Sequence, residues 1–213
     1  LTRGYLECVK KFAEAAWQSD PEMTIMTSLN IGPNGYRRGT PEYDLAVEMA
    51  GWFIAQGKGD KLAWDSHYDG TIPFADSGAK FENMMGITLQ RELAKDFPGF
   101  KLVLTPMEEN GGRCDWDRGL AHAHNWNTLQ RYGDCFRMVG TANTFQPHKL
   151  HYDWNQGRIH FLADTLWFQP SAHIDEMMMK TWKPLVVSTE SSDPVLDITA
   201  KTDHGRKELT LYL

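Results

Sequence analysis

Two adjacent carboxylates follow a short apolar run near the middle of the chain. Glu108 and Glu109 come soon after Leu102-Val103-Leu104, a run that predicts a buried strand. Because successive strand residues point to opposite faces, only one of the two carboxylates can point into a shared site. A carboxylate there can act as a nucleophile or as a general base, and a solvated acidic loop is the alternative.

Two other predicted strands also end in polar residues. His67 and Tyr68 follow the run that begins at Lys61, and Asn143 follows the run at 135–141. Aromatic rings near such residues suit sugars, whose C–H faces stack on them, although core packing explains many tryptophans. The aromatic candidates are Tyr68, Trp116, Trp126, Trp154 and Trp167.

Metal and cofactor sites are not predicted. His122 and His124 are two apart in a predicted helix and face different ways. His148 and His151 have no cysteine or acidic partner at ligand spacing. The three cysteines are odd in number and widely spaced, which predicts thiols and no disulfide framework. Glycine-rich phosphate-binding fingerprints are absent.

Composition limits the classes of partner. The 213 residues carry a net charge of −6, with 41% hydrophobic and 23% charged residues, as in ordinary globular proteins. The negative charge and scattered basic residues argue against nucleic acid, and no apolar run reaches the length of a membrane span. The chain starts at Leu1 without Met, so we expect a fragment whose compartment, cytoplasmic or secreted, the sequence does not reveal.

Strand and helix patterns alternate over most of the chain, which predicts a parallel sheet covered by helices. The predicted strands begin near Met23, Lys61, Lys101 and Cys135, and helices follow each of them. Thr40 and Pro41 predict a helix start, as N-cap and first-turn residue. Both an open sheet and a barrel fit this order, and the missing phosphate fingerprints favour a (β/α)₈ barrel.

The last part of the chain has a different pattern. From Lys183 onward helical periodicity stops, and three strand-like runs are separated by turns at 191–194 and 204–205. These runs predict antiparallel strands. We therefore expect two domains, residues 1–182 in the barrel and residues 183–213 at the beginning of a β-sandwich.

At the strand ends the sequence resembles glycoside hydrolase family 51, the α-L-arabinofuranosidases. The run Lys101 to Asn110 matches, without a gap, the family's nucleophile strand, which ends in Asp-Glu-Trp-Asn. The similarity continues in order through His67-Tyr68, Leu129 to Met138, Ala142-Asn143, Trp154 to Ile159 and the β-type tail. It implies that the chain holds strands five to eight of a (β/α)₈ TIM barrel, followed by strands of an antiparallel β-sandwich.

The resemblance assigns roles to residues of this chain. It implies a retaining enzyme that removes terminal arabinofuranosyl groups from arabinose-containing oligo- or polysaccharides, with Glu108 as nucleophile. Tyr68 would orient Glu108 and keep it ionised. The expected sugar contacts are His67, Asn110, Asn143 and Trp154. No cofactor is implied, and a homo-oligomer is compatible with the family.

Departures from the family leave alternatives open. Glu109 replaces an aromatic residue and is an alternative nucleophile, and Asn143 replaces a glutamine. The segment 121–127 is more polar than usual. The family's acid/base pair Asn-Glu would lie before Leu1, so we expect the chain alone to be inactive and poorly soluble. A β-xylosidase or endoglucanase-like hydrolase, a non-catalytic carbohydrate-binding homologue and an unrelated barrel with a Glu base are the rival interpretations.

Overall fold

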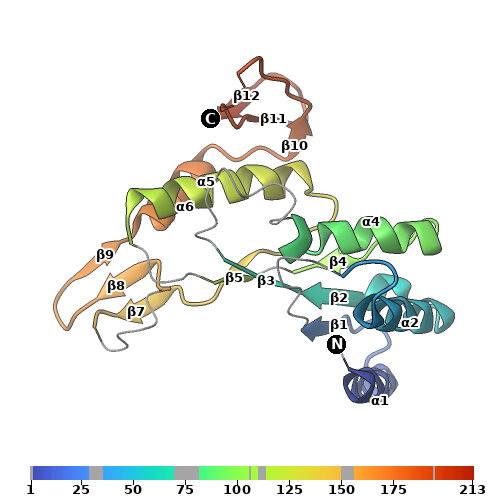
Figure 1. Cartoon of the computed structure of the whole chain (residues 1–213). Coiled ribbons are helices and arrows are strands. Elements are labelled where there is room, and N and C mark those ends of the chain that lie inside the picture. Colours follow the sequence, from blue (N-terminus) through green and yellow to red (C-terminus); the bar gives the residue numbers. More distant parts are fainter. Residues whose placement is uncertain are drawn as a thin grey trace. The chain divides into compact units, whose positions relative to one another are not determined.

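The structure is a computed structural model (Figure 1). It describes residues 2–28, 36–69, 82–105, 107–109, 114–149, 156–193 and 195–213. The chain forms two compact units. The first comprises Leu1–Tyr68, Asp76–Met107 and Asp134–Gly140, and the second comprises Asp69–Ala75, Glu108–Gly133 and Thr141–Leu213.

Parallel strands form the centre of the first unit. Strand β2 (Leu62–Asp65) lies between β1 (Ile25–Ser28) and β4 (Val103–Leu104), and both neighbours run parallel to it. A parallel bridge then joins Leu104 to Phe136. The strands thus follow one another across the sheet in chain order, which confirms the predicted parallel sheet. Closure into a barrel stays a prediction.

Two helices of the first unit begin with a threonine N-cap. Helix α1 (Arg3–Ser19) is capped by the Thr2 side chain, and α2 (Pro41–Ala55) by the Thr40 side chain. Both cap oxygens accept a backbone N–H that the first turn leaves without a helical partner. A short 3₁₀ helix, η1 (Gly59–Lys61), leads from α2 to β2. The predicted Thr40 cap is confirmed.

The core of the first unit is apolar. Leu6, Phe53 and Trp64 are 0% exposed, and burial of one such side chain stabilises the fold by about 1.5–3 kcal/mol. Trp17 stacks on Trp52 with ring centroids 5.8 Å apart, and its ring meets Phe53 edge-on at 5.4 Å. The period of apolar residues in α1 and α2 therefore corresponds to the observed core.

The helix expected after the strand that begins near Lys61 is interrupted at Gly86. Helix α4 comprises Ile87–Asp96, and Gly86 before it has a φ of 80°. A left-handed residue does not continue an α-helix, and glycine adopts it without a Cβ penalty. Met85 therefore lies outside α4, while Leu89 and Leu93 are buried in it.

A second sheet contains the ends of the predicted catalytic strands. Its order is β3 (His67–Asp69), β5 (Met107–Glu109) and β6 (Gly140–Thr141). The single strand expected at 135–141 is observed as the bridge at Phe136 and the short β6. The intervening residues 137–139 are not part of a strand. The run at 135–141 therefore predicted a longer strand than the structure contains.

The second unit contains two helices in contact. They are α5 (Trp116–Arg131) and α6 (Pro170–Lys180). Gly119 of α5 lies directly against Pro170: a Cβ at Gly119 would be 2.9 Å from the Cβ of Pro170. Glycine thus permits this close approach between the helices.

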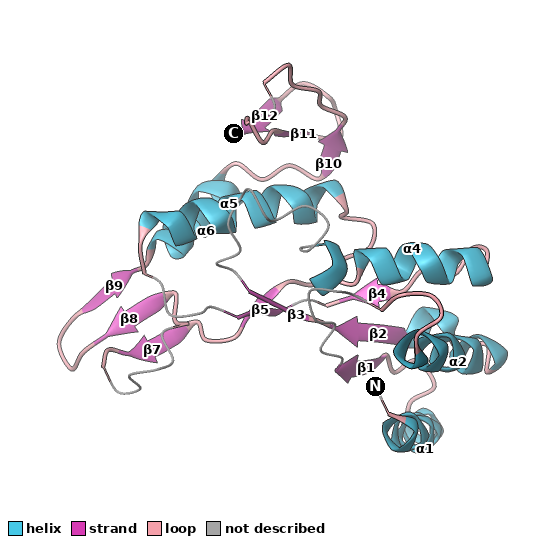
Figure 2. Cartoon of the chain, viewed as in Figure 1, coloured by secondary structure: helices cyan, strands magenta, loops and turns pink. Residues whose placement is uncertain are grey.

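A small mixed sheet also belongs to the second unit (Figure 2). Strand β8 (Ile159–Phe161) pairs in parallel with β7 (Phe145–Pro147) and antiparallel with β9 (Leu166–Phe168). The family resemblance extends to Ile159, but no strand was predicted at Phe145 or Leu166. Each of these strands has only three residues, which is too short to produce a clear alternating pattern.

The C-terminal strands are antiparallel, as predicted. Strand β11 (Thr199–Thr202) lies between β10 (Leu185–Val187) and β12 (Leu209–Tyr212). The run predicted at 195–200 therefore begins four residues later, at Thr199. This sheet belongs to the same compact unit as α5 and α6, and the domain boundary at Lys183 stays a prediction.

Candidate active site

The predicted nucleophile lies on the central strand of the second sheet. Glu108 and Glu109 are in β5, Tyr68 is in β3, and β5 lies between β3 and β6 in the sheet order. For Tyr68, Glu108 and Glu109 the structure describes the backbone, and their side chains lie outside the described part of the chain. Asn110 and Trp154 lie outside the described residues altogether.

His67 has a carboxylate partner. Its Nε2 is 3.1 Å from Oδ2 of Asp65, whose side chain is 10% exposed, whereas the His67 side chain is 33% exposed. A carboxylate partner favours the tautomer with the hydrogen on Nε2 and holds the ring in one orientation. Asp65 therefore restricts the orientation of the His67 imidazole.

Asn143 is anchored through its backbone. Its carbonyl oxygen accepts a 3.2 Å hydrogen bond from the backbone N–H of Arg158, and the next carbonyl, of Thr144, accepts one from Ile159 at 2.9 Å. The Arg158 side chain reaches the same segment, because its Nε donates to Oγ1 of Thr141 at 3.1 Å. Arg158 therefore holds both sides of the segment that contains Asn143.

Arg158 belongs to a partly buried polar group that we call the Asp175 cluster. It consists of Asp175 and its three partners, Arg158, His122 and Trp126. Arg158 forms an ion pair with Oδ2 of Asp175. Nε2 of His122 and Nε1 of Trp126 are each 2.7 Å from Oδ1. His122 is 1% exposed and Arg158 is 7% exposed. The Asp175 carboxylate therefore compensates the positive charge of Arg158, which is removed from water.

A second carboxylate connects α5 to the segment before β11. Asp197 accepts hydrogen bonds from His124 at 2.8 Å, Asn127 at 3.1 Å and Arg131 at 2.6 Å. Burial alone would raise the pKa of Asp197, but the hydrogen bonds from His124 and Arg131 outweigh it and lower the pKa. His122 and His124 thus contact different parts of the second unit, which confirms that they face different ways.

Neither Arg158 nor Asp175 was predicted as a functional residue, and for His122 the sequence predicted only that it faces away from His124. Asp175 lies 17 residues from Arg158 and 53 from His122, so no local spacing relates them. The unusual polarity of segment 121–127 was the available signal. In α5 it corresponds to buried His122, Asn125 and Asn127.

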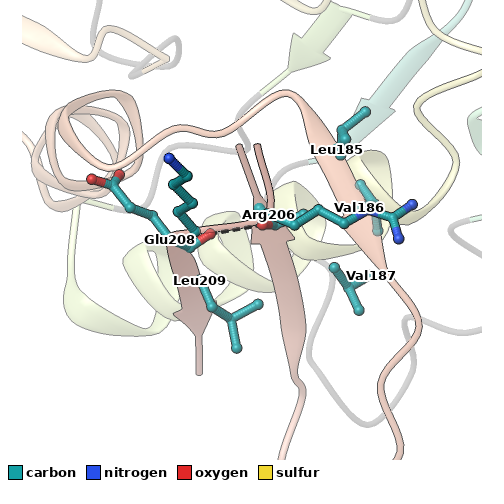
Figure 3. A pocket seen from close by; sticks show the side chains of 8 residues that line it. Leu185, Val186, Val187, Arg206, Glu208 and Leu209 are labelled. Atoms are coloured by element: carbon teal, nitrogen blue, oxygen red, sulfur yellow. Dashed lines mark hydrogen bonds between the residues drawn. The ribbon is translucent and has the colours of Figure 1, made fainter. Parts of the chain in front are cut away.

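The described cavities do not contain the predicted sugar contacts. One, of about 580 Å³, lies on the C-terminal sheet and is lined by Leu185, Val186, Val187, Thr202 and residues 206–209 (Figure 3). Another, of about 600 Å³, contains Phe100 and Lys101, which precede β4 and so lie at its amino end. The chemistry of parallel α/β sheets gathers at the carboxyl ends of the strands.

Within the described ranges, no three His, Cys, Asp or Glu side chains form a group that could hold a metal ion. In the same part of the chain, no helix is both long and apolar enough to cross a membrane. Cys8 and Cys135 take part in no disulfide.

Comparisons with known proteins give little further information. No family model and no curated protein matches the chain. A solved structure described as that of a lucidum protein is similar, with a TM-score of 0.38 and 11% sequence identity. The match covers 80% of this chain and 60% of that one, so the chain spans about three fifths of its structural relative. A likeness this distant carries no argument about function.

Proposed function

We propose that the chain is part of a retaining glycoside hydrolase that removes terminal α-L-arabinofuranosyl groups, with Glu108 as nucleophile. The observation that carries the proposal is the position of Glu108. It follows β4 in a set of parallel strands and lies in β5, the middle strand of its sheet. The gapless similarity of Lys101 to Asn110 to the family's nucleophile strand supports the same residue.

The proposed chemistry is a double displacement. A carboxylate oxygen of Glu108 attacks the anomeric carbon, and the bond to the leaving oxygen breaks as a second carboxylic acid protonates that oxygen. Water then attacks the glycosyl–enzyme ester, the second carboxylate takes its proton, and Glu108 is released. In the family, the second carboxyl group belongs to a strand that precedes the region this chain resembles.

Other residues would bind and orient. Tyr68 would donate a hydrogen bond to Glu108 and favour its ionised form. The anchored Asn143 and the oriented His67 would contact sugar hydroxyls, with Asn110 and Trp154 completing the expected contacts. Each of these roles comes from the family resemblance. The hydrogen bonds to Asp65 and Arg158 support them by restricting two of the residues.

Kinetics of two single variants test the proposal on the full-length gene product. With an aryl α-L-arabinofuranoside, we expect Glu108→Gln to lower kcat/KM by about a thousandfold or more, because the amide is not a nucleophile. Glu109→Gln is the matched control and should change kcat/KM less than tenfold. The reverse pattern would assign the nucleophile to Glu109.

The rival functions give different results in the same experiment. A β-xylosidase or endoglucanase-like enzyme would turn over another member of an aryl glycoside panel and not the arabinofuranoside. A carbohydrate-binding homologue would turn over none and still bind an arabinose-containing polysaccharide. Wild-type protein that neither hydrolyses nor binds any of them would contradict all three.

A further inference from the structure

Two histidines approach each other in the small sheet of the second unit. His160 is the central residue of β8, and His148 follows β7, the parallel neighbour of β8. Their ring centroids are 5.8 Å apart with an interplanar angle of 43°. The backbone N–H of His148 donates to the carbonyl of Phe161 at 2.9 Å, which fixes the base of the pair.

The environment of His160 favours a neutral ring with an available nitrogen. The residue is 2% exposed, and its Nε2 has no hydrogen-bond partner among the described residues. A buried imidazole nitrogen without a partner costs free energy. A neutral imidazole is the form that binds metals.

The separation of the rings suits a shared metal ion. Zinc–nitrogen bonds are about 2.0–2.1 Å long, and a ring centroid lies about 1.2 Å behind its nitrogen. At a tetrahedral angle, two imidazoles on one zinc ion therefore have centroids about 5.2 Å apart. The observed centroid separation is 5.8 Å. It corresponds to a nitrogen–zinc–nitrogen angle somewhat wider than tetrahedral, or to a movement of the two rings towards each other by about half an ångström on metal binding.

We propose that His148 and His160 form a binding site for a divalent transition-metal ion that prefers imidazole, such as Zn²⁺ or Ni²⁺. The pair would provide two of the ligands of the ion, and the described residues provide no third His, Cys, Asp or Glu ligand. Trp167 stands opposite His160 in β9 and lies against both rings, at 4.9 Å from His148 and 5.8 Å from His160. It covers one side of the pair and limits how far the rings can turn.

The proposal is independent of the glycosidase function. The metal ion would join β7 to β8 as a clamp, and no step of the proposed hydrolysis uses it. The sequence did not indicate the pair, since no local spacing relates positions 148 and 160 and only the pairing of β7 with β8 brings them together.

Calorimetric titration of the purified protein with zinc chloride at pH 7 tests the site. We expect wild type to bind zinc and His148→Ala to bind it at least about tenfold more weakly. His148 is half-buried, so this variant should fold, and circular dichroism checks that it does. His204→Ala removes an exposed histidine of the C-terminal turn and should bind zinc as wild type does.

Two outcomes would overturn the site. One is a wild-type protein that binds no zinc at millimolar concentration. The other is a folded His148→Ala variant with unchanged zinc affinity, which would place the bound zinc elsewhere. Magnesium chloride is the ligand control: it should give no binding heat at this site, because Mg²⁺ prefers oxygen ligands.

Discussion

The two compact units of the chain are stabilised in different ways. In the first, buried Leu6, Phe53 and Trp64 form an apolar core under helices with regular apolar periodicity. In the second, α5 buries Arg118, His122 and Asn125, and carboxylates from distant segments bind its histidines. The first kind of core is encoded by local periodicity, whereas the second depends on partners far apart in the sequence.

This difference affects how each unit responds to change. Apolar contacts are non-directional and tolerate small shifts of the side chains. In a buried ion pair, by contrast, loss of one charged partner leaves the other charge uncompensated. The second unit should therefore be the more sensitive to isosteric polar substitutions, and the first to loss of side-chain volume.

The largest effect is expected from removing volume in the first unit. Phe53→Ala leaves a cavity beside Trp17 and Trp52 and should lower the free energy of unfolding by about 3–5 kcal/mol. Urea denaturation followed by tryptophan fluorescence measures it. Phe12→Ala, at a side chain that is 64% exposed, is the control and should change stability by less than about 1 kcal/mol. Equal effects of the two variants would show that the described core is wrong.

An isosteric change tests the polar unit. Asp175→Asn keeps the shape of the side chain but removes the carboxylate charge that pairs with Arg158. We expect a loss of about 1–3 kcal/mol, since the carboxylate is partly exposed. Glu176→Gln, at the neighbouring exposed position that pairs with Lys180, is the matched control and should be close to neutral. If Asp175→Asn is also neutral in thermal unfolding, the cluster does not stabilise the second unit.

Two glycine substitutions sharpen the comparison further. In an exposed helix, Gly→Ala stabilises by up to about 1 kcal/mol, and this is expected for Gly4→Ala in α1, where no atom lies within 4 Å of an added Cβ. Gly119→Ala should instead destabilise by about 1–2 kcal/mol, because the new Cβ would press on the Pro170 ring. Thermal unfolding of both variants measures these changes in stability. Stabilisation by Gly119→Ala would contradict the close packing of α5 on α6.

The smallest effect concerns pH. Since burial lowers the pKa of His160, the unfolded chain takes up a proton before the folded one as the pH falls below the ordinary value of 6.5. The free energy of unfolding should therefore decrease as pH falls from about 7 to 5. His160→Gln should make this decrease shallower, measured by urea denaturation with EDTA present. The same slope in both proteins would mean that His160 titrates normally.

The sequence predicted the first unit better than the second, for a physical reason. Thr40-Pro41 and the spacing of Leu6, Val9 and Ala13 are local signals, and the structure contains the corresponding caps and core. Strands β7 and β9 are three residues long and give no periodic signal. The pairs Arg158–Asp175 and His148–His160 arise from tertiary packing, so residue spacing did not reveal them.

For the candidate site, the sequence predicted more residue roles than the structure can test. The assignment of Glu108, Tyr68, Asn110 and Trp154 rests on resemblance, because their side chains lie outside the described part of the chain. What the fold adds is the anchoring of Asn143 by Arg158 and the pairing of His67 with Asp65. Motif similarity could not predict either contact, because it does not show which groups of the folded chain lie within hydrogen-bond distance of one another.

The central claim is that Glu108 is a glycosidase nucleophile. The most direct measurement incubates the full-length gene product with a mechanism-based arabinofuranosyl inactivator and maps the label by peptide mass spectrometry. We predict a stable ester on Glu108, formed at the same rate at which activity is lost. Inactivation with no label on either carboxylate of β5, or no inactivation of a protein that hydrolyses arabinofuranosides, would contradict the claim.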